Sequence, residues 1–230
     1  MQTLQAARRT LLLLAVAFGA WWLALAIAPL HRDDWALENV LVVVCVVAVA
    51  ATYRRWPLSP ASYMLLFVFL CMHEIGAHYT YSEVPYDAWF QAVTGTSLNS
   101  LMGWERNHFD RLGHFLYGLL LAYPVREIIL RATGVRGFWS YFFPVEFIVA
   151  SSALYEMFEW AAAVYFGGDL GVAYLGTQGD VWDAQRDMVL ASLGGLLAML
   201  GAAVWHRMRG RDGAQQWLRQ TTSQDGVCAP

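Results

Sequence analysis

The sequence contains no lysine, few charges of either sign and only three cysteines. All fifteen basic residues are arginines and the formal net charge is −3. No basic stripe lies outside the flanks of the apolar segments, so a nucleic-acid-binding protein is not indicated. Cys45 and Cys71 lie in apolar segments and Cys228 lies in the tail, so no disulfide framework is indicated. No Ser-His-Asp or Cys-His pattern is specific enough to indicate nucleophilic catalysis.

The chain is instead rich in apolar sequence. Hydrophobic residues make up 58% of the 230 residues, charged residues 14%, and the mean hydropathy is +0.40. Six apolar segments each approach or exceed the roughly 20 residues that a membrane-spanning helix needs. They are residues 10–29, 35–53, 61–79, 107–130, 139–166 and 181–206. We therefore predict an all-α, polytopic membrane protein with six transmembrane helices, in which residues 1–207 form the membrane domain and residues 208–230 a mobile cytoplasmic tail.

The alternative for the first apolar segment is a cleavable signal peptide, because Ala26-Ile27-Ala28 resembles a signal-peptidase cleavage site. Pro29 at the next position and the length of the segment favour an uncleaved helix.

A long connection, residues 80–106, joins the third and fourth helices and is rich in tyrosine and tryptophan. Connections of this length are commonly lids or binding loops, and such aromatic residues suit a membrane interface.

The arginines are distributed unevenly between the two predicted sides of the membrane. Eleven lie at the termini and in the second–third and fourth–fifth connections, and four lie on the other side: Arg32, Arg106, Arg111 and Arg186. Because positive residues are enriched in cytoplasmic connections, we predict that both termini are cytoplasmic.

Four short polar patches interrupt the apolar helices. Ionisable groups are costly in hydrocarbon and usually mark a site or a pathway. Within each patch the spacing of three, four or seven residues places the side chains on one helical face. The patches are Glu74/His78, Asn107/Asp110/His114, Ser152/Glu156/Glu159 and Asp180/Asp183/Asp187. With the predicted topology most of these groups lie within roughly 15 Å of the outer surface, so we expect a polar site in the bundle of the third to sixth helices.

The residue types in these patches indicate a divalent metal site. Imidazole nitrogens and carboxylate oxygens are the ligand mix of zinc, iron or manganese. The predicted ligands are His78, Asp110, His114, Glu156, Glu159 and Asp183. A carboxylate outside the metal shell, Glu74 or Asp187, would act as general base. Arg106, Arg111 and Arg186 could bind a phosphate group, and His73, Asn107, His108 and Asp180 complete the predicted polar site.

Three functions are compatible with these patches. The preferred one is a periplasm-facing, metal-dependent hydrolase that acts on an anionic lipid or lipid-linked phosphate, with the metal activating water. A proton- or ion-coupled transporter is the second, although the inner halves of the third, fourth and sixth helices are nearly all apolar. The third is a structural network, in which interhelical hydrogen bonds of about 0.6 kcal/mol each hold the bundle together.

Several motifs resemble those of the YjdF-type family of bacterial inner-membrane proteins, a domain of unknown function. They are HEIGAHYTY at 73–81 with EVPYD at 83–87, RNHFDRLGHFLYG at 106–118, YEMFEW at 155–160 and GTQGDVWD at 176–183. The resemblance covers the chain from about Arg54 to Arg207 and implies a bacterial inner-membrane location and a helical fold, but no reaction. The final third is also loosely similar to VanZ-like membrane proteins.

Overall fold

The computed structural model describes residues 2–168, 175 and 177–222, and within these residues the chain is all-helical with no strand. By length and composition, five helices could cross a membrane. Their spans are Leu4–Leu25, Arg32–Thr52, Pro60–Tyr79, Trp139–Tyr165 and Asp183–Arg209. Many large apolar side chains on these helices point outward, Val43, Val44 and Val47 of the second among them. Such continuous apolar exposure is typical of surfaces that contact lipid.

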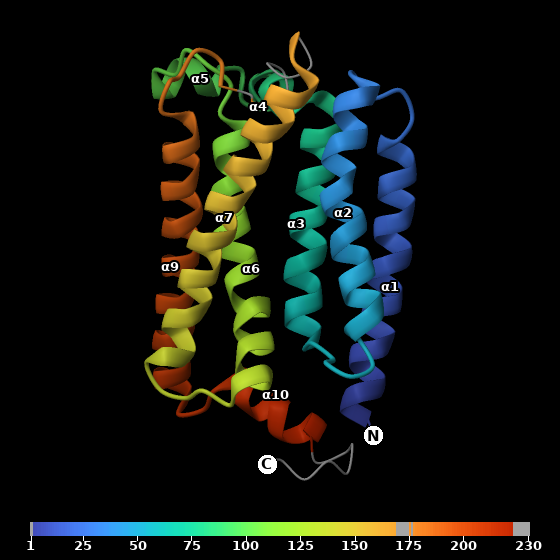
Figure 1. The fold of residues 1–230 in the computed structure, drawn as a ribbon, viewed down its shortest axis with the longest axis vertical. Coiled ribbons are helices and arrows are strands. Elements are labelled where there is room, and N and C mark those ends of the chain that lie inside the picture. Colours follow the sequence, from blue (N-terminus) through green and yellow to red (C-terminus); the bar gives the residue numbers. More distant parts are fainter. Residues whose placement is uncertain (1, 169–174, 176, 223–230) are drawn as a thin grey trace.

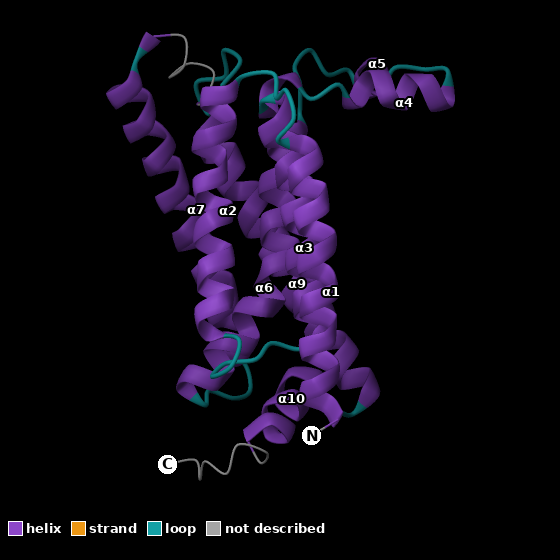
Figure 2. Ribbon diagram, turned by 90° about the vertical axis from the view of Figure 1, so that its right-hand side faces the viewer, coloured by secondary structure: helices purple, strands orange, loops and turns teal. Residues whose placement is uncertain are grey.

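Six long helices form the bundle (Figure 1). They are α1 (Gln2–Leu25), α2 (Arg32–Thr52), α3 (Pro60–Tyr79), α6 (Phe109–Thr133), α7 (Trp139–Phe166) and α9 (Asp183–Arg209). The short helices are η1 (Tyr81–Glu83), α4 (Tyr86–Thr94), α5 (Leu98–Met102) and α10 (Gly213–Thr222). Figure 2 shows α4 and α5 at one end of the bundle, the loop end, and α10 beside the start of α1 at the other, the terminal end.

Capping residues explain where several of these helices begin and end. Ser59 caps α3, its hydroxyl accepting a hydrogen bond from the Ser62 amide at 3.3 Å, and Pro60 occupies the first helical position. Gly134 and Gly210 end α6 and α9 with φ of 66° and 61°, a conformation that glycine adopts without strain.

The closest helix contact is between α6 and α9. A Cβ atom at Gly118 would collide with the backbone of Ala191, and one at Gly194 would collide with the backbone of Phe115. Glycine at these two positions therefore allows the two backbones to meet, as in other membrane helix pairs. This contact sets the positions of the polar side chains that α6 and α9 carry toward the loop end.

An apolar core lies between α6, α7 and α9, where Ala122, Ile148, Ala191 and Met199 are buried. This core separates the polar side chains of the loop end from those of the terminal end.

The prediction of a mobile tail after residue 207 is wrong for residues 213–222. They form α10, whose Trp217 is buried against Leu58 and Tyr63 and donates a hydrogen bond to the Pro57 carbonyl at 2.9 Å. The buried residues Ala214, Trp217 and Thr221 are spaced three and four apart, so one face of a short amphipathic helix covers this end of the bundle. Residues 223–230 lie outside the described part of the chain.

Candidate functional site

The loop end of α6, α7 and α9 holds a group of acids around one histidine, the acid–His cluster, formed by Asp110, His114, Glu156, Glu159 and Asp187. His114 Nε2 lies 3.7 Å from Asp110 Oδ1, one turn earlier on α6, and 3.5 Å from Glu156 Oε1 on α7. One possible ligand atom from each of Asp110, His114 and Asp187 lies within 4.8 Å of the others. Asp187, which we expected to be a general base, therefore lies among the possible metal ligands.

The acid–His cluster is buried, and its acids lack enough donors. His114 and Glu159 are each 8% exposed and Asp187 is 2% exposed. Within the described residues, Glu156 Oε1 and Asp187 Oδ1 are buried without a hydrogen-bond donor. Buried polar atoms are nearly always hydrogen-bonded, and an exception calls for a specific explanation, such as a bound ion or water. The cluster therefore has more carboxylate oxygens than hydrogen-bond donors to pair with them.

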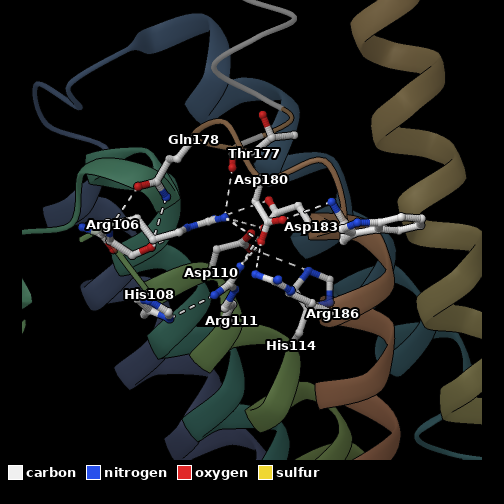
Figure 3. A network of polar contacts seen from close by, with 12 residues as sticks. Arg106, His108, Asp110, Arg111, His114, Thr177, Gln178, Asp180, Asp183 and Arg186 are labelled. Atoms are coloured by element: carbon white, nitrogen blue, oxygen red, sulfur yellow. Dashed lines mark hydrogen bonds and ion pairs between the residues drawn. The ribbon is translucent and has the colours of Figure 1, made fainter. Parts of the chain in front are cut away.

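Three arginines lie next to Asp110 and His114 of this cluster (Figure 3). Arg106 Nη1 bonds to Asp183 Oδ1 at 2.6 Å, and Arg111 Nη2 bonds to Asp180 Oδ2 at 2.5 Å. Arg186 also donates to Asp180. The pKa of the Asp180 carboxyl is lowered, first by the hydrogen bond from the Trp182 amide and then by Arg186 and Arg111. Asp183, a predicted metal ligand, thus faces arginines.

Asn107 and His108 organise the rim of the site. The Asn107 side chain accepts a hydrogen bond from the Phe109 amide at 2.9 Å and donates one to the Val84 carbonyl at 2.8 Å. The His108 ring stacks on Trp104 with centroids 4.3 Å apart. These contacts fix the start of α6 and leave both side chains outside the acid–His cluster.

The patch on α3 lies apart from the other three. His78 Nδ1 is 2.7 Å from the Leu25 carbonyl oxygen, so this predicted ligand points toward α1. Glu74 is fully buried and faces Trp35 and Asn39 of α2. His78, a predicted ligand, and Glu74, a predicted general base, therefore both lie away from the acid–His cluster. The spacing placed them on one face of α3 correctly, but α1 and α2 cover that face.

His73 lies on a different face of α3 and belongs to a network that the sequence analysis missed. Its Nδ1 is 2.5 Å from Tyr81 Oη, and its Nε2 is 3.2 Å from the Glu38 carbonyl oxygen. Tyr155 of α7 donates to Glu38 Oε2 at 3.4 Å, and its ring lies edge-on to His114. The sequence does contain a pattern that indicates this network: Asp34 and Glu38 have the same four-residue spacing as the other polar patches. Both residues are buried in the structure.

A cavity of about 290 Å³ lies between these two networks. Its polar lining consists of His73, Tyr81, Asp110, His114, Tyr117, Ser151, Ser152 and Tyr155. The remaining wall is apolar, and its α7 part includes Leu154 and Phe158, which are 54% and 69% exposed on the outside of the bundle. The cavity is at the lower limit of ligand pockets, about 300 Å³. It suits a narrow, largely apolar group with one polar end.

Comparison with known proteins identifies the family. The family described as "Predicted membrane protein (DUF2238)" matches residues 10–208. The chain belongs to this family. It is also 39% identical to the inner membrane protein YjdF of Escherichia coli strain K12 over 173 residues, which are 75% of this chain and 78% of that protein. The resemblance to YjdF-type proteins is confirmed, and the chain is a multi-pass integral membrane protein. No solved structure matches it.

The acid–His cluster of this family member has the composition of a metal site. Zinc–oxygen and zinc–nitrogen bonds of about 2.0–2.2 Å place tetrahedral ligands about 3.3–3.6 Å apart. The donor atoms of Asp110, His114 and Asp187 lie within 4.8 Å of one another, so rotation of these side chains would bring them around one ion. Glu156 is close enough to His114 to complete such a shell.

Proposed function

We propose that the chain crosses the bacterial inner membrane six times, with α6 as the sixth spanning helix and the loop end facing the periplasm. Helix α6 has 25 residues, and its charged side chains lie near its two ends. Eleven of the fifteen arginines lie at or near the terminal end, which supports a cytoplasmic position for that end. In a Cys228→Ser background, a membrane-impermeant maleimide should label Glu105→Cys in intact spheroplasts and Arg136→Cys only after lysis. The reverse pattern would overturn this orientation.

We further propose that the acid–His cluster binds one divalent cation, zinc, iron or manganese, through Asp110, His114 and Asp187, with Glu156 as a fourth ligand. One observation carries this proposal: three donor atoms lie within 4.8 Å of one another where two buried carboxylate oxygens lack donors. A cation would supply the missing positive charge. Helix bundles commonly build such sites from carboxylates and histidines on facing helices.

A hydrolase acting on an anionic lipid or lipid-linked phosphate is the activity that this geometry supports best. A bound divalent cation makes water acidic enough to attack a phosphate ester near neutral pH. Glu159, buried on α7 one turn after Glu156, would be the general base at such a site. The cavity adjoins Asp110 and His114 and reaches exposed Leu154 and Phe158, so an acyl chain could enter from the side. The candidates for binding the phosphate of the substrate are Arg106, Arg111 and Arg186. On binding, hydrogen bonds to the phosphate would replace some of the hydrogen bonds that these arginines donate to Asp180 and Asp183.

The structure favours this function over a transporter. A proton or ion path would have to continue from Asp187 toward the terminal end. The buried core of Ala122, Ile148, Ala191 and Met199, which are all apolar, lies in that direction. A one-sided site fits this arrangement better than a relay across the membrane.

The test is phosphate release from long-chain lipid monophosphates and diphosphates by the purified protein in nanodiscs, with each of the three metals added. Wild type should release phosphate, and H114A and D187N should each lose at least about 100-fold in rate because a metal ligand is gone. E105Q removes an exposed acid at the same end and should keep the rate. Absence of phosphate release from every substrate, or equal rates in all variants, would contradict a hydrolase.

A further inference from the structure

A second large hollow lies on the opposite edge of the bundle, between α1, α2 and α3. It has a volume of about 960 Å³ and almost entirely aliphatic and aromatic walls. Helices α1 and α2 each pack on α3, and the Trp22 indole of α1 donates to Asn39 Oδ1 of α2 at 2.5 Å. Trp22 thus bridges the two helices where the groove ends toward the loop end.

The other end of this groove is basic. Arg8 and Arg54 line it there, and both are exposed. In the described part of the chain neither has a carboxylate within 4.0 Å, whereas Arg106, Arg111 and Arg126 all form ion pairs. The Tyr53 hydroxyl accepts a hydrogen bond from Arg54 Nε at 2.8 Å, which holds this guanidinium at the groove.

We infer that this groove binds one anionic phospholipid, with its phosphate on Arg8 and Arg54 and an acyl chain lying toward Trp22. The length of the groove agrees with this occupant. Trp22 follows Arg8 by fourteen residues, which is about 21 Å along a helix. One leaflet of a bilayer measures roughly 15 Å of hydrocarbon plus about 5–7 Å of headgroup. A lipid whose phosphate lies on Arg8 and Arg54 therefore has room for a whole acyl chain along the groove.

The positive charge of Arg8 and Arg54 at the basic end of the groove decides between the possible occupants. The apolar walls cannot select a lipid, because every acyl chain is as apolar as leucine. An apolar helix of a second copy could pack on the small residues Ala15 and Gly19, but it would leave both arginines without an anion. Two basic residues near the headgroups favour an anionic over a zwitterionic lipid by roughly 30-fold together.

The experiment is native mass spectrometry of the full chain in detergent with equimolar phosphatidylglycerol and phosphatidylethanolamine. Wild type should carry one bound lipid with phosphatidylglycerol enriched roughly 30-fold, and R8A/R54A should lower the enrichment to below about threefold. R9A/R55A is the matched control, because it removes the same charge from the neighbouring residues, which do not line the groove. This control should keep the enrichment. Equal loss in both double variants would show a diffuse surface-charge effect and overturn the site.

A groove-filling variant tests the site without changing charge. A Cβ at Gly19 meets nothing within 4 Å, so G19F can fill the groove without a collision at its root. It should remove the bound phosphatidylglycerol, while A20F on the neighbouring exposed position keeps it, with equal unfolding midpoints in both variants. A protein that is dimeric in wild type, monomeric in G19F and unchanged in lipid selectivity would assign the groove to a second copy instead. These outcomes are independent of any hydrolase or metal measurement.

Discussion

The two ends of the α6–α9 pair each bury a polar cluster, and the two clusters differ in how well their charges are matched. At the terminal end, Arg126 is fully buried and bonds to both carboxylate oxygens of Asp212, at 3.0 and 2.5 Å. It also donates to the Ser140 carbonyl at 3.1 Å and lies 4.1 Å from the centre of the Tyr141 ring. His206 completes this Arg126 cluster through a 2.9 Å contact with Tyr141 Oη.

The acid–His cluster at the loop end is the opposite case. Four carboxylates surround one histidine, the neighbouring arginines bond to Asp180 and Asp183 instead, and two buried oxygens lack donors. A buried cluster that only stabilises a bundle should resemble the Arg126 cluster, with every charge paired. Proteins commonly accept such unfavourable local arrangements at functional sites. The contrast supports the proposal that the loop end holds a cation, whereas the paired charges of the Arg126 cluster hold the helices together.

The largest effect should come from R126A. Removing one partner of a buried ion pair leaves the other without compensation and typically costs about 3–5 kcal/mol. We expect a loss of this size in the free energy of unfolding in detergent, with R136A, an exposed arginine near the same end, close to wild type. A loss below about 1 kcal/mol in R126A would mean that the Arg126 cluster is not the structural one.

Opening the α6–α9 contact should weaken both clusters at once. In G194A the new methyl group meets the Phe115 backbone, so the helices must separate, at a cost of about 1–3 kcal/mol. Metal binding should also fall, although no ligand is changed. G201A on the same helix has nothing within 4 Å and should keep both stability and metal. Metal content unchanged in G194A would show that the site does not depend on this contact.

Removing a single acid from the loop end should stabilise the metal-free protein. In D187N one of four buried carboxylates becomes neutral, which reduces repulsion, and we expect about 0.5–2 kcal/mol of added unfolding free energy in the presence of a chelator. Without chelator, bound metal should stabilise wild type and so remove its deficit in unfolding free energy relative to D187N. Destabilisation of D187N by more than about 1 kcal/mol in chelator would instead assign Asp187 a structural role.

The smallest effect concerns pH. Burial opposes ionisation of Asp212, but the hydrogen bond and charge of Arg126 outweigh it and hold the pKa of this carboxyl below its ordinary value. A carboxyl whose pKa is lower in the folded than in the unfolded protein stabilises the fold at pH values above its unfolded pKa of about 3.9. This stabilisation is lost as the pH falls through the pKa of the folded state. The stability difference between wild type and D212N should therefore stay constant from pH 8 to pH 5 and shrink below pH 4. A difference that already shrinks between pH 7 and pH 5 would contradict this pairing.

Apolar segment length and turn residues were enough to predict the long helices, and the six predicted segments correspond to α1, α2, α3, α6, α7 and α9. The polar spacing on α6 also placed Asp110 and His114 on one face correctly. The spacing of residues defines a face of a helix but not the neighbouring helix that covers this face. It could therefore not show that Glu74 turns toward α2 and His78 toward α1. A face becomes a site only when the packing order of the helices is known.

Two further differences have separate causes. Asp34 and Glu38 precede the valine- and alanine-rich part of α2, and their four-residue spacing already indicates one polar face. Helix α10 is short, and its buried face consists of Ala214, Trp217 and Thr221. Such a helix is stable only through tertiary contacts, here with Pro57 and Arg131, which lie far away in the sequence.

The decisive measurement for the acid–His cluster is the metal content of the purified protein, by inductively coupled plasma mass spectrometry after dialysis against metal-free buffer. We predict about one zinc, iron or manganese ion per wild-type or R136A chain and less than about 0.1 per chain in H114A and in D187N. A wild-type protein that binds none of these metals even when they are supplied, or variants that retain as much metal as wild type, would contradict it.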